Sequence, residues 1–357
     1  MSTSTLVGTD GAGRSVYRSK HINRDGRQVL LYAHAPHAHP PTGAELDRAE
    51  GSGELRRHPL RLEWNIYAPA RQDRTYKPDG AADPLAPSQP GGPATEIPFA
   101  TFDLAVFENR FPSLSGASAD APAAGAQSRP AAGRCEVVVY GPEREGSLAT
   151  LTIDRRRLLV AAWNDRYSEM FAAGHEFVLP FENRGEEAGV TLHHPHGQIY
   201  AFDFVPPVQA ASERAFAAGF DLAARLNDWR EAFEVMNAGG LSVFAPPFAR
   251  FPFELWIASR APRRGPWDYN REELDAFATL LGDVTQRYDD YFGRPTPYMM
   301  SLHAAPRRAG AGFQFTTQFY PLLRSRDKVK FLASIEQATG VFTVDVLPEW
   351  AAKELRR

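Results

Sequence analysis

The chain has little cysteine and no long apolar run. Cys135 is the single cysteine among 357 residues, which excludes an internal disulfide and any metal site built on several thiolates. No apolar stretch approaches the ~20 residues that a helix needs to cross a bilayer. The N-terminal residues lack the basic-then-apolar order of a secretion signal. These absences favour a cytoplasmic protein that does not bind membranes.

Neither sign of charge is in excess. The chain has 40 Lys and Arg against 43 Asp and Glu, a formal net charge of −3, so it lacks the basic surplus of a nucleic-acid or anionic-membrane binder. A hydrophobic fraction of 43% over this length suffices for one large or two modest domains. Composition therefore favours a cytoplasmic enzyme.

Strand-like and helical patterns alternate twice along the chain. Residues 152–174 have helical periodicity and end at a glycine, and a second helix is expected over about 211–235. A third helix is expected from Asn270, where Glu273 is placed for a capping box. Short β-like runs separate these helices, so we expect two related halves.

Histidine is also scarce, yet three of the ten histidines lie in HHPHGQIY, residues 193–200. In an extended strand, residues two apart point to the same face, so His194, His196 and Gln198 are expected to project together. Gly197 allows the backbone to pass close to a ligand. A histidine pair near a strand is more often structural than catalytic, and the segment alone leaves both interpretations open.

The run HPHGQ resembles the active-site signature of the galactose-1-phosphate uridylyltransferases, a family of the histidine-triad superfamily. Other segments resemble this family in the same order: WNIYAPARQDRTYKP (64–78), AVFENRFPSL (105–114), FENRG (181–185), PYMMSLHAAP, QFYPLLRS and KFLASIEQ. The resemblance covers roughly residues 55–357, which makes a chance match of one motif a poor explanation.

The resemblance implies an α+β fold. Two related histidine-triad-like halves, each an antiparallel sheet with packed helices, are expected to form a half-barrel. The implied domains are an N-terminal extension, partly flexible, over residues 1–54, a transferase half with the HPHGQ site over 55–209, and a second transferase half with the sugar-side segment over 210–357.

The same resemblance implies an activity: transfer of UMP from a UDP-sugar to a sugar 1-phosphate by a ping-pong mechanism. His196 is the implied nucleophile, which carries the uridylyl group covalently, and Gln198 holds a phosphate oxygen. We interpret His193 as structural. The resemblance assigns substrate binding to Arg71, Arg74, Asn109, Phe111, Asn183, Thr191 and His194, and, from the partner subunit of a homodimer with a shared active site, to Lys330, Phe331 and Glu336.

Gln198 separates two reaction classes. Hydrolytic members of the superfamily have a histidine at this position, and an imidazole there can exchange protons and assist water. An amide cannot do acid–base work near neutral pH. Gln198 therefore favours transfer over hydrolysis.

Many family members have a zinc site made of a Cys-x-x-Cys pair, a later histidine and the first histidine of HPH. The corresponding positions here are Asp83, Ala86, Arg144 and His194. A stable zinc centre needs three or four good ligands, so we predict no zinc and no other cofactor.

A second metal site of some members joins a glutamate to three histidines. His303 is retained, but the later positions are Thr316 and Gln318, and Glu213 lies near the glutamate's place without clear register. This site is also expected to be lost. The loss should not affect a catalytic step, because the family's metals are structural.

Substrate identity stays open. Ile335 and Phe342 stand where some members have a tyrosine and a glutamine near the sugar. The alternatives are a transferase for another sugar 1-phosphate or nucleotide in a specialised pathway, a nucleotide phosphorylase or hydrolase of the same superfamily, and a catalytically silent nucleotide-binding protein. The retained nucleophile at position 196 argues against the last.

Overall fold

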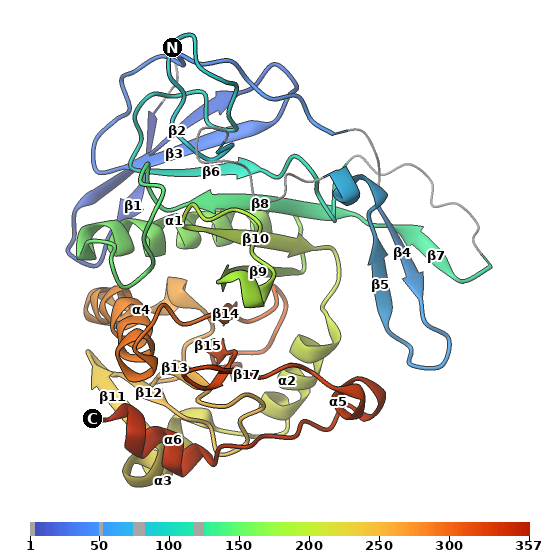
Figure 1. Ribbon diagram of the computed structural model, residues 1–357, viewed down its shortest axis with the longest axis vertical. Coiled ribbons are helices and arrows are strands. Elements are labelled where there is room, and N and C mark those ends of the chain that lie inside the picture. The colour runs from blue at the N-terminus through green and yellow to red at the C-terminus, as the bar shows by residue number, and fades with distance from the viewer. Residues whose placement is uncertain (1–3, 50–52, 74–82, 117–124) are drawn as a thin grey trace.

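The computed structural model describes residues 4–49, 53–73, 83–116 and 125–357. Its main feature is a twelve-stranded sheet in the order β1-β2-β3-β6-β8-β10-β9-β14-β15-β13-β12-β11, and all neighbouring strands are antiparallel (Figure 1). The strands are β1 (Ser4–Thr9), β2 (Ser15–Ile22), β3 (Gln28–Ala33), β6 (Leu104–Glu108), β8 (Gly133–Val139), β9 (Phe177–Arg184), β10 (His196–Phe202), β11 (Glu234–Ala238), β12 (Leu241–Phe244), β13 (Leu255–Ser259), β14 (Tyr298–His303) and β15 (Thr316–Pro321). The α+β class predicted from the sequence is confirmed.

The first strands join the main sheet. In the described part of residues 1–54, β1, β2 and β3 continue that sheet, because β3 pairs with β6. The division into an extension over 1–54 and a transferase half from residue 55 stays a prediction. The polar, mixed composition of this segment concealed the strands, since both faces of β1 keep partly exposed residues.

The helices are α1 (Ile153–Ala172), α2 (Pro207–Ala217), α3 (Leu222–Phe233), α4 (Arg271–Phe292), α5 (Ser334–Thr339) and α6 (Pro348–Leu355). Asn270 and Glu273 form the predicted capping box at the start of α4. The single helix expected over 211–235 is wrong: Gly219, at φ 95°, lies between α2 and α3, and the Asp221 side chain caps α3.

The order of elements repeats in the two halves. In the first half, β8, α1, β9 and β10 follow one another, and in the second half β13, α4, β14 and β15 do the same. The corresponding strands have the same order in the two halves but in opposite directions, β8-β10-β9 and β14-β15-β13. The halves meet where β9 pairs with β14. The division between residues 209 and 210 and the half-barrel stay predictions.

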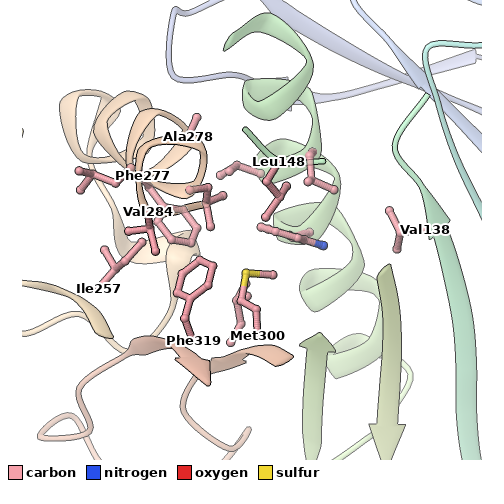
Figure 2. Close-up of a cluster of buried hydrophobic side chains, with 14 of the residues drawn as sticks. Val138, Leu148, Ile257, Phe277, Ala278, Val284, Met300 and Phe319 are labelled. Atoms are coloured by element: carbon pink, nitrogen blue, oxygen red, sulfur yellow. The ribbon is translucent and has the colours of Figure 1, made fainter. Parts of the chain in front are cut away.

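The two long helices share the main core. α1 packs against α4, with the rings of Trp163 and Phe277 6.5 Å apart. Figure 2 shows Phe277 and Val284 of α4 gathered with Met300 of β14 and Phe319 of β15, all buried. This core fixes the helices on the sheet and so holds the central strands β9, β10, β14 and β15 in place.

A three-stranded sheet, β5-β4-β7, projects beside the main sheet (Figure 1). It consists of β4 (Glu54–Arg57), β5 (Trp64–Tyr67) and β7 (Ser128–Pro130), and a hairpin of β16 (Leu323–Ser325) and β17 (Lys328–Val329) precedes α5. The loop between β4 and β5 reaches α5, where Arg61 donates to the Gln337 carbonyl at 3.3 Å. Over the described ranges, every helix is too short or too polar to cross a membrane.

Candidate active site

His196 lies at the first position of β10, in the middle of the main sheet, where β10 pairs with β8 and β9. Its ring lines two cavities, one of about 400 Å³ and one of about 110 Å³. The larger cavity extends toward β9 and the segment 295–296, and the smaller one toward the end of β6. A substrate that spans both cavities would therefore pass the imidazole.

The proton position on His196 follows from its hydrogen bond. Nδ1 lies 2.7 Å from the carbonyl oxygen of His194, and because a carbonyl only accepts, Nδ1 carries the hydrogen. Nε2 of the neutral ring then holds the lone pair. Burial lowers the pKa of His196 more than the hydrogen bond to the carbonyl raises it. The ring is therefore suited to nucleophilic attack at neutral pH.

This lowered pKa predicts a pH profile. We expect the rate of covalent labelling by a UDP-sugar to reach half its maximum at a pH below the ordinary histidine pKa of about 6.5, because the lowered pKa keeps Nε2 unprotonated there. Single-turnover labelling at each pH measures this. A half-maximal rate at pH ~6.5 or above would show an ordinary or raised histidine pKa.

The smaller cavity brings together six of the predicted site residues, which arrive from four separate segments: Arg71, Asn109, Phe111, Thr191, His196 and Gln198. Arg71 lies on the short 3-10 helix Pro69–Asp73 and donates to the Phe111 carbonyl at 2.9 Å. Asn109 accepts from the Phe111 amide through Oδ1 at 2.8 Å, which leaves its amide NH₂ as the donor for a ligand. The cavity thus offers donors beside an aromatic ring.

The larger cavity contains Asn183, His194 and His196. Its floor includes Glu182, whose carboxylate accepts from the hydroxyls of Tyr140 and Tyr298, both at 2.7 Å. Burial raises the pKa of Glu182 although these hydrogen bonds lower it. His193 also lines this cavity and is largely exposed, 3.8 Å from Glu186.

The expected common face of His194 and His196 is wrong. β10 begins at His196, so His194 precedes the strand and its fully buried ring points to Asp83 and to the Gly141 carbonyl. The glycine at position 197 is also explained by packing rather than by the approach of a ligand. A Cβ there would lie 2.5 Å from the Tyr140 hydroxyl, so the glycine makes room for Tyr140.

The chain is 35% identical over 321 residues to the galactose-1-phosphate uridylyltransferase of Thermotoga maritima, which covers 85% of this chain and 98% of the relative. It belongs to the galactose-1-phosphate uridylyltransferase family. A relative of the same name from Streptomyces lividans is 34% identical over 87% of this chain and 88% of the relative. Residues 46–206 match the family described as galactose-1-phosphate uridyl transferase, N-terminal domain.

Solved structures agree with this membership. A structure described as a uridylyltransferase superposes with a TM-score of 0.76 at 27% identity, covering 85% of this chain and 97% of that one. An ADP-glucose phosphorylase from Arabidopsis thaliana, at 21% identity and a TM-score of 0.64, shares the fold. The resemblance deduced from the motifs is therefore confirmed.

Three predicted site residues are not brought to these cavities, and a fourth, Arg74, lies outside the described residues. Lys330, Phe331 and Glu336 belong to the C-terminal segment and line neither cavity of the same chain. The Lys330 ammonium donates to Glu336 at 2.8 Å, and Phe331 is 73% exposed. Their predicted role in a partner's site stays a prediction.

Two residues of the smaller cavity escaped the sequence analysis. Glu96 is 6% exposed, lines the cavity and accepts from the Arg27 guanidinium at 2.7 Å. Burial raises its pKa despite that charge. Arg110 lies over the Phe111 ring at 5.2 Å, and its buried Nε has no hydrogen-bond partner among the described residues. Arg110 stands inside the quoted AVFENRFPSL segment, whereas nothing in the sequence around Glu96 indicated a role.

The positions of the second family metal are occupied by a hydrogen-bonded cluster. The ring of His303 contacts Gln209 at 3.3 Å and Ser301 at 2.8 Å, and Gln318 donates to Thr316 at 2.9 Å. Burial and the charge of Arg250 lower the pKa of His303 to about 4. Glu213 lies on α2. Within the described residues, no group of three or more His, Cys, Asp or Glu side chains is arranged to hold a metal ion.

Proposed function

We propose that this protein transfers UMP from a UDP-sugar to a sugar 1-phosphate through a uridylyl group carried on Nε2 of His196. The observation that carries the proposal is the imidazole between two cavities, with Nδ1 hydrogen-bonded and Nε2 without a hydrogen-bond partner among the described residues. The names of its relatives support the same reaction.

The proposed transfer needs no added base. Nε2 attacks the α-phosphorus, a P–N bond forms, and the bond from that phosphorus to the bridging oxygen breaks, so that the sugar 1-phosphate leaves with the electron pair. The ring becomes positively charged, and the Nδ1–H bond to the His194 carbonyl stabilises that charge. A phosphate oxygen of the second sugar 1-phosphate then attacks the same phosphorus and returns the neutral ring.

The cavities fit the two parts of such a substrate. The smaller one, with Asn109, Phe111 and Arg71, has the aromatic face and amide donors that suit a nucleoside and its phosphate. The larger one is lined by more polar residues, among them Asn183, Ser147 and Thr150, which suit a sugar phosphate. His196 is common to both.

Replacing Gln198 by histidine should raise hydrolysis relative to transfer. Gln198 lines the smaller cavity next to His196, and its amide donates a hydrogen bond without exchanging protons, whereas an imidazole can assist water. The ratio of free UMP to UDP-sugar formed by the variant measures the effect. An unchanged ratio would contradict the role given to Gln198.

The C-terminal segment supports a homodimer with a shared active site. Phe331, Leu332, Ile335 and Val341 are exposed by 73, 44, 48 and 64%, and they lie on one segment of the chain together with Lys330. Apolar side chains gathered in this way favour contact with another protein surface. The proposal is that a second copy covers them and that Lys330 of each copy serves its partner's site. We place this dimer in the cytoplasm.

Incubation with UDP-glucose radiolabelled in the uridylyl phosphate tests the proposal. We expect acid-labile, base-stable label at one group per active site, discharged by galactose 1-phosphate. Cys135→Ser is a control that should label normally, because burial raises the pKa of the Cys135 thiol to about 11 and keeps it unreactive. Absence of label with a panel of NDP-sugars would refute the transfer.

A further inference from the structure

The positions that correspond to the family's zinc ligands form an ion cluster in this chain. Nδ1 of His194 lies 2.8 Å from the Asp83 carboxylate, and Nε of Arg144 lies 3.4 Å from the same carboxylate oxygen. The His194 side chain is fully buried and that of Asp83 is 12% exposed. An imidazole and a guanidinium thus flank one largely buried carboxylate.

Both ring nitrogens of His194 are engaged in hydrogen bonds. Nε2 lies 2.8 Å from the Gly141 carbonyl oxygen, and Nδ1 lies 2.8 Å from the Asp83 carboxylate. Burial raises the pKa of Asp83, but the hydrogen bonds from His194 and the Leu85 amide and the nearby charges lower it further. The ring is therefore held from both sides, between a carboxylate and a backbone carbonyl.

A zinc ion does not fit these residues. Both ring nitrogens of His194 are already paired, one with the Asp83 carboxylate and one with the Gly141 carbonyl, each at 2.8 Å. Ala86 has no donor atom in its side chain, and Arg144 brings a positive charge toward the same carboxylate. The cluster replaces the metal instead of forming part of its site.

His194 of the cluster lies two positions before His196, the proposed nucleophile. The ring of His194 is held at both nitrogens, and the same residue's carbonyl accepts from Nδ1 of His196 at 2.7 Å. Next to it, the Pro195 carbonyl accepts from the Tyr140 amide at 3.1 Å. Fixing the His194 ring therefore fixes the backbone oxygen that selects the Nδ1–H form of His196.

We propose that Asp83, through the doubly hydrogen-bonded His194, is the positioning residue that orients His196 and sets its tautomer without a metal. This role rests on the proposed transfer through His196. Asp83 itself touches neither the reacting phosphorus nor the nucleophile.

The test compares Asp83→Ala with Asp83→Asn and with a control variant, Asp228→Ala. Asp228 also pairs with an arginine, Arg225, but on the exposed surface. Removal of an outer partner typically costs about 10–100-fold, and we expect that loss in the rate of covalent labelling by UDP-glucose. UDP affinity should change little, because Asp83 lines neither cavity. Asp83→Asn, which keeps an acceptor, should recover part of the rate, and Asp228→Ala should label as wild type. An unchanged labelling rate in Asp83→Ala would overturn the proposal.

A second measurement needs no turnover. In ¹⁵N-histidine-labelled protein, long-range ¹⁵N–¹H spectra should show His196 protonated at Nδ1 in the wild type and a mixture of both tautomers in Asp83→Asn. If the wild type does not label but the two proteins differ in this way, the proposed transfer is refuted and the positioning role of Asp83 is kept. One zinc per chain in protein purified without chelator, or an Nε2–H form of His196, would refute the cluster's role.

Discussion

Replacement of His196 by alanine should abolish covalent labelling by UDP-glucose and lower transfer by a factor on the order of 10⁴ to 10⁶, the loss seen when a covalent enzyme loses its nucleophile. The variant removes the side chain that lines both cavities and its Nδ1 hydrogen bond to the His194 carbonyl. The backbone pairing of β10 with β8 and β9 is kept, so the protein should stay folded. UDP should still bind, since Asn109, Phe111 and Arg71 are untouched.

The matched control is the neighbouring His193→Ala. Its side chain is 68% exposed, and we interpret it as structural, so the variant should reach the labelling stoichiometry of the wild type. Calorimetry with UDP and single-turnover labelling measure the two variants side by side. Label retained by His196→Ala, or lost with His193→Ala, would assign the nucleophile to the wrong histidine.

The sequence alone predicted the repeated halves and several element boundaries well. The apolar periodicity of 152–174 corresponds to α1, and the Asn270–Glu273 pair begins α4, because both features are local and their hydrogen bonds close within one turn. The helix over 211–235 failed for a local reason as well. The glycine at 219 adopts a positive φ, which the apolar pattern does not reveal.

The site was predictable only in part, because its geometry depends on where strands begin. The alternation argument placed His194 and His196 on one face, but it holds only inside a strand, and pairing of β10 with β8 starts at His196. His194 therefore turns into the protein. The proposed nucleophile and its neighbours were implied by the resemblance, whereas spacing along the chain did not indicate them.

Long-range polar contacts were beyond the reach of sequence patterns. Glu96 reaches the smaller cavity while bonded to Arg27, 69 residues earlier in the chain. Asp83 meets His194 across 111 residues. Both pairs depend on loops whose course no periodicity determines. The pairs form because the sheet brings β3, β6 and β10 together, which only the structure shows.

A buried ion pair beneath the site carries the second large effect. Arg166 of α1 donates to the Glu136 carboxylate of β8 through Nε and Nη2, at 2.9 and 3.0 Å, and the two residues are 4 and 1% exposed. We expect Arg166→Met to lower the free energy of unfolding by about 3 kcal/mol, because it leaves a buried carboxylate with one fewer partner. Arg134 remains bonded to Glu136 at 2.6 Å and limits the loss.

Urea unfolding at neutral pH measures this change, with Arg225→Met as the matched control. Arg225 pairs with Asp228 where both side chains are more than half exposed, so its loss should stay within about 0.5 kcal/mol. Equal unfolding midpoints for the two variants would show that the buried pair contributes no more than a surface pair.

The pH dependence of that difference distinguishes a charge effect from lost packing. Burial raises the pKa of Glu136, but Arg166 and Arg134 lower it to below its ordinary value of 4.5. A lowered carboxyl pKa stabilises the folded wild type above about pH 4.5, and that contribution is lost as pH falls through the folded pKa. The Arg166→Met variant lacks most of this stabilisation at every pH. The difference in free energy of unfolding between wild type and variant should therefore narrow below about pH 4.5, whereas a difference caused by packing alone would stay constant.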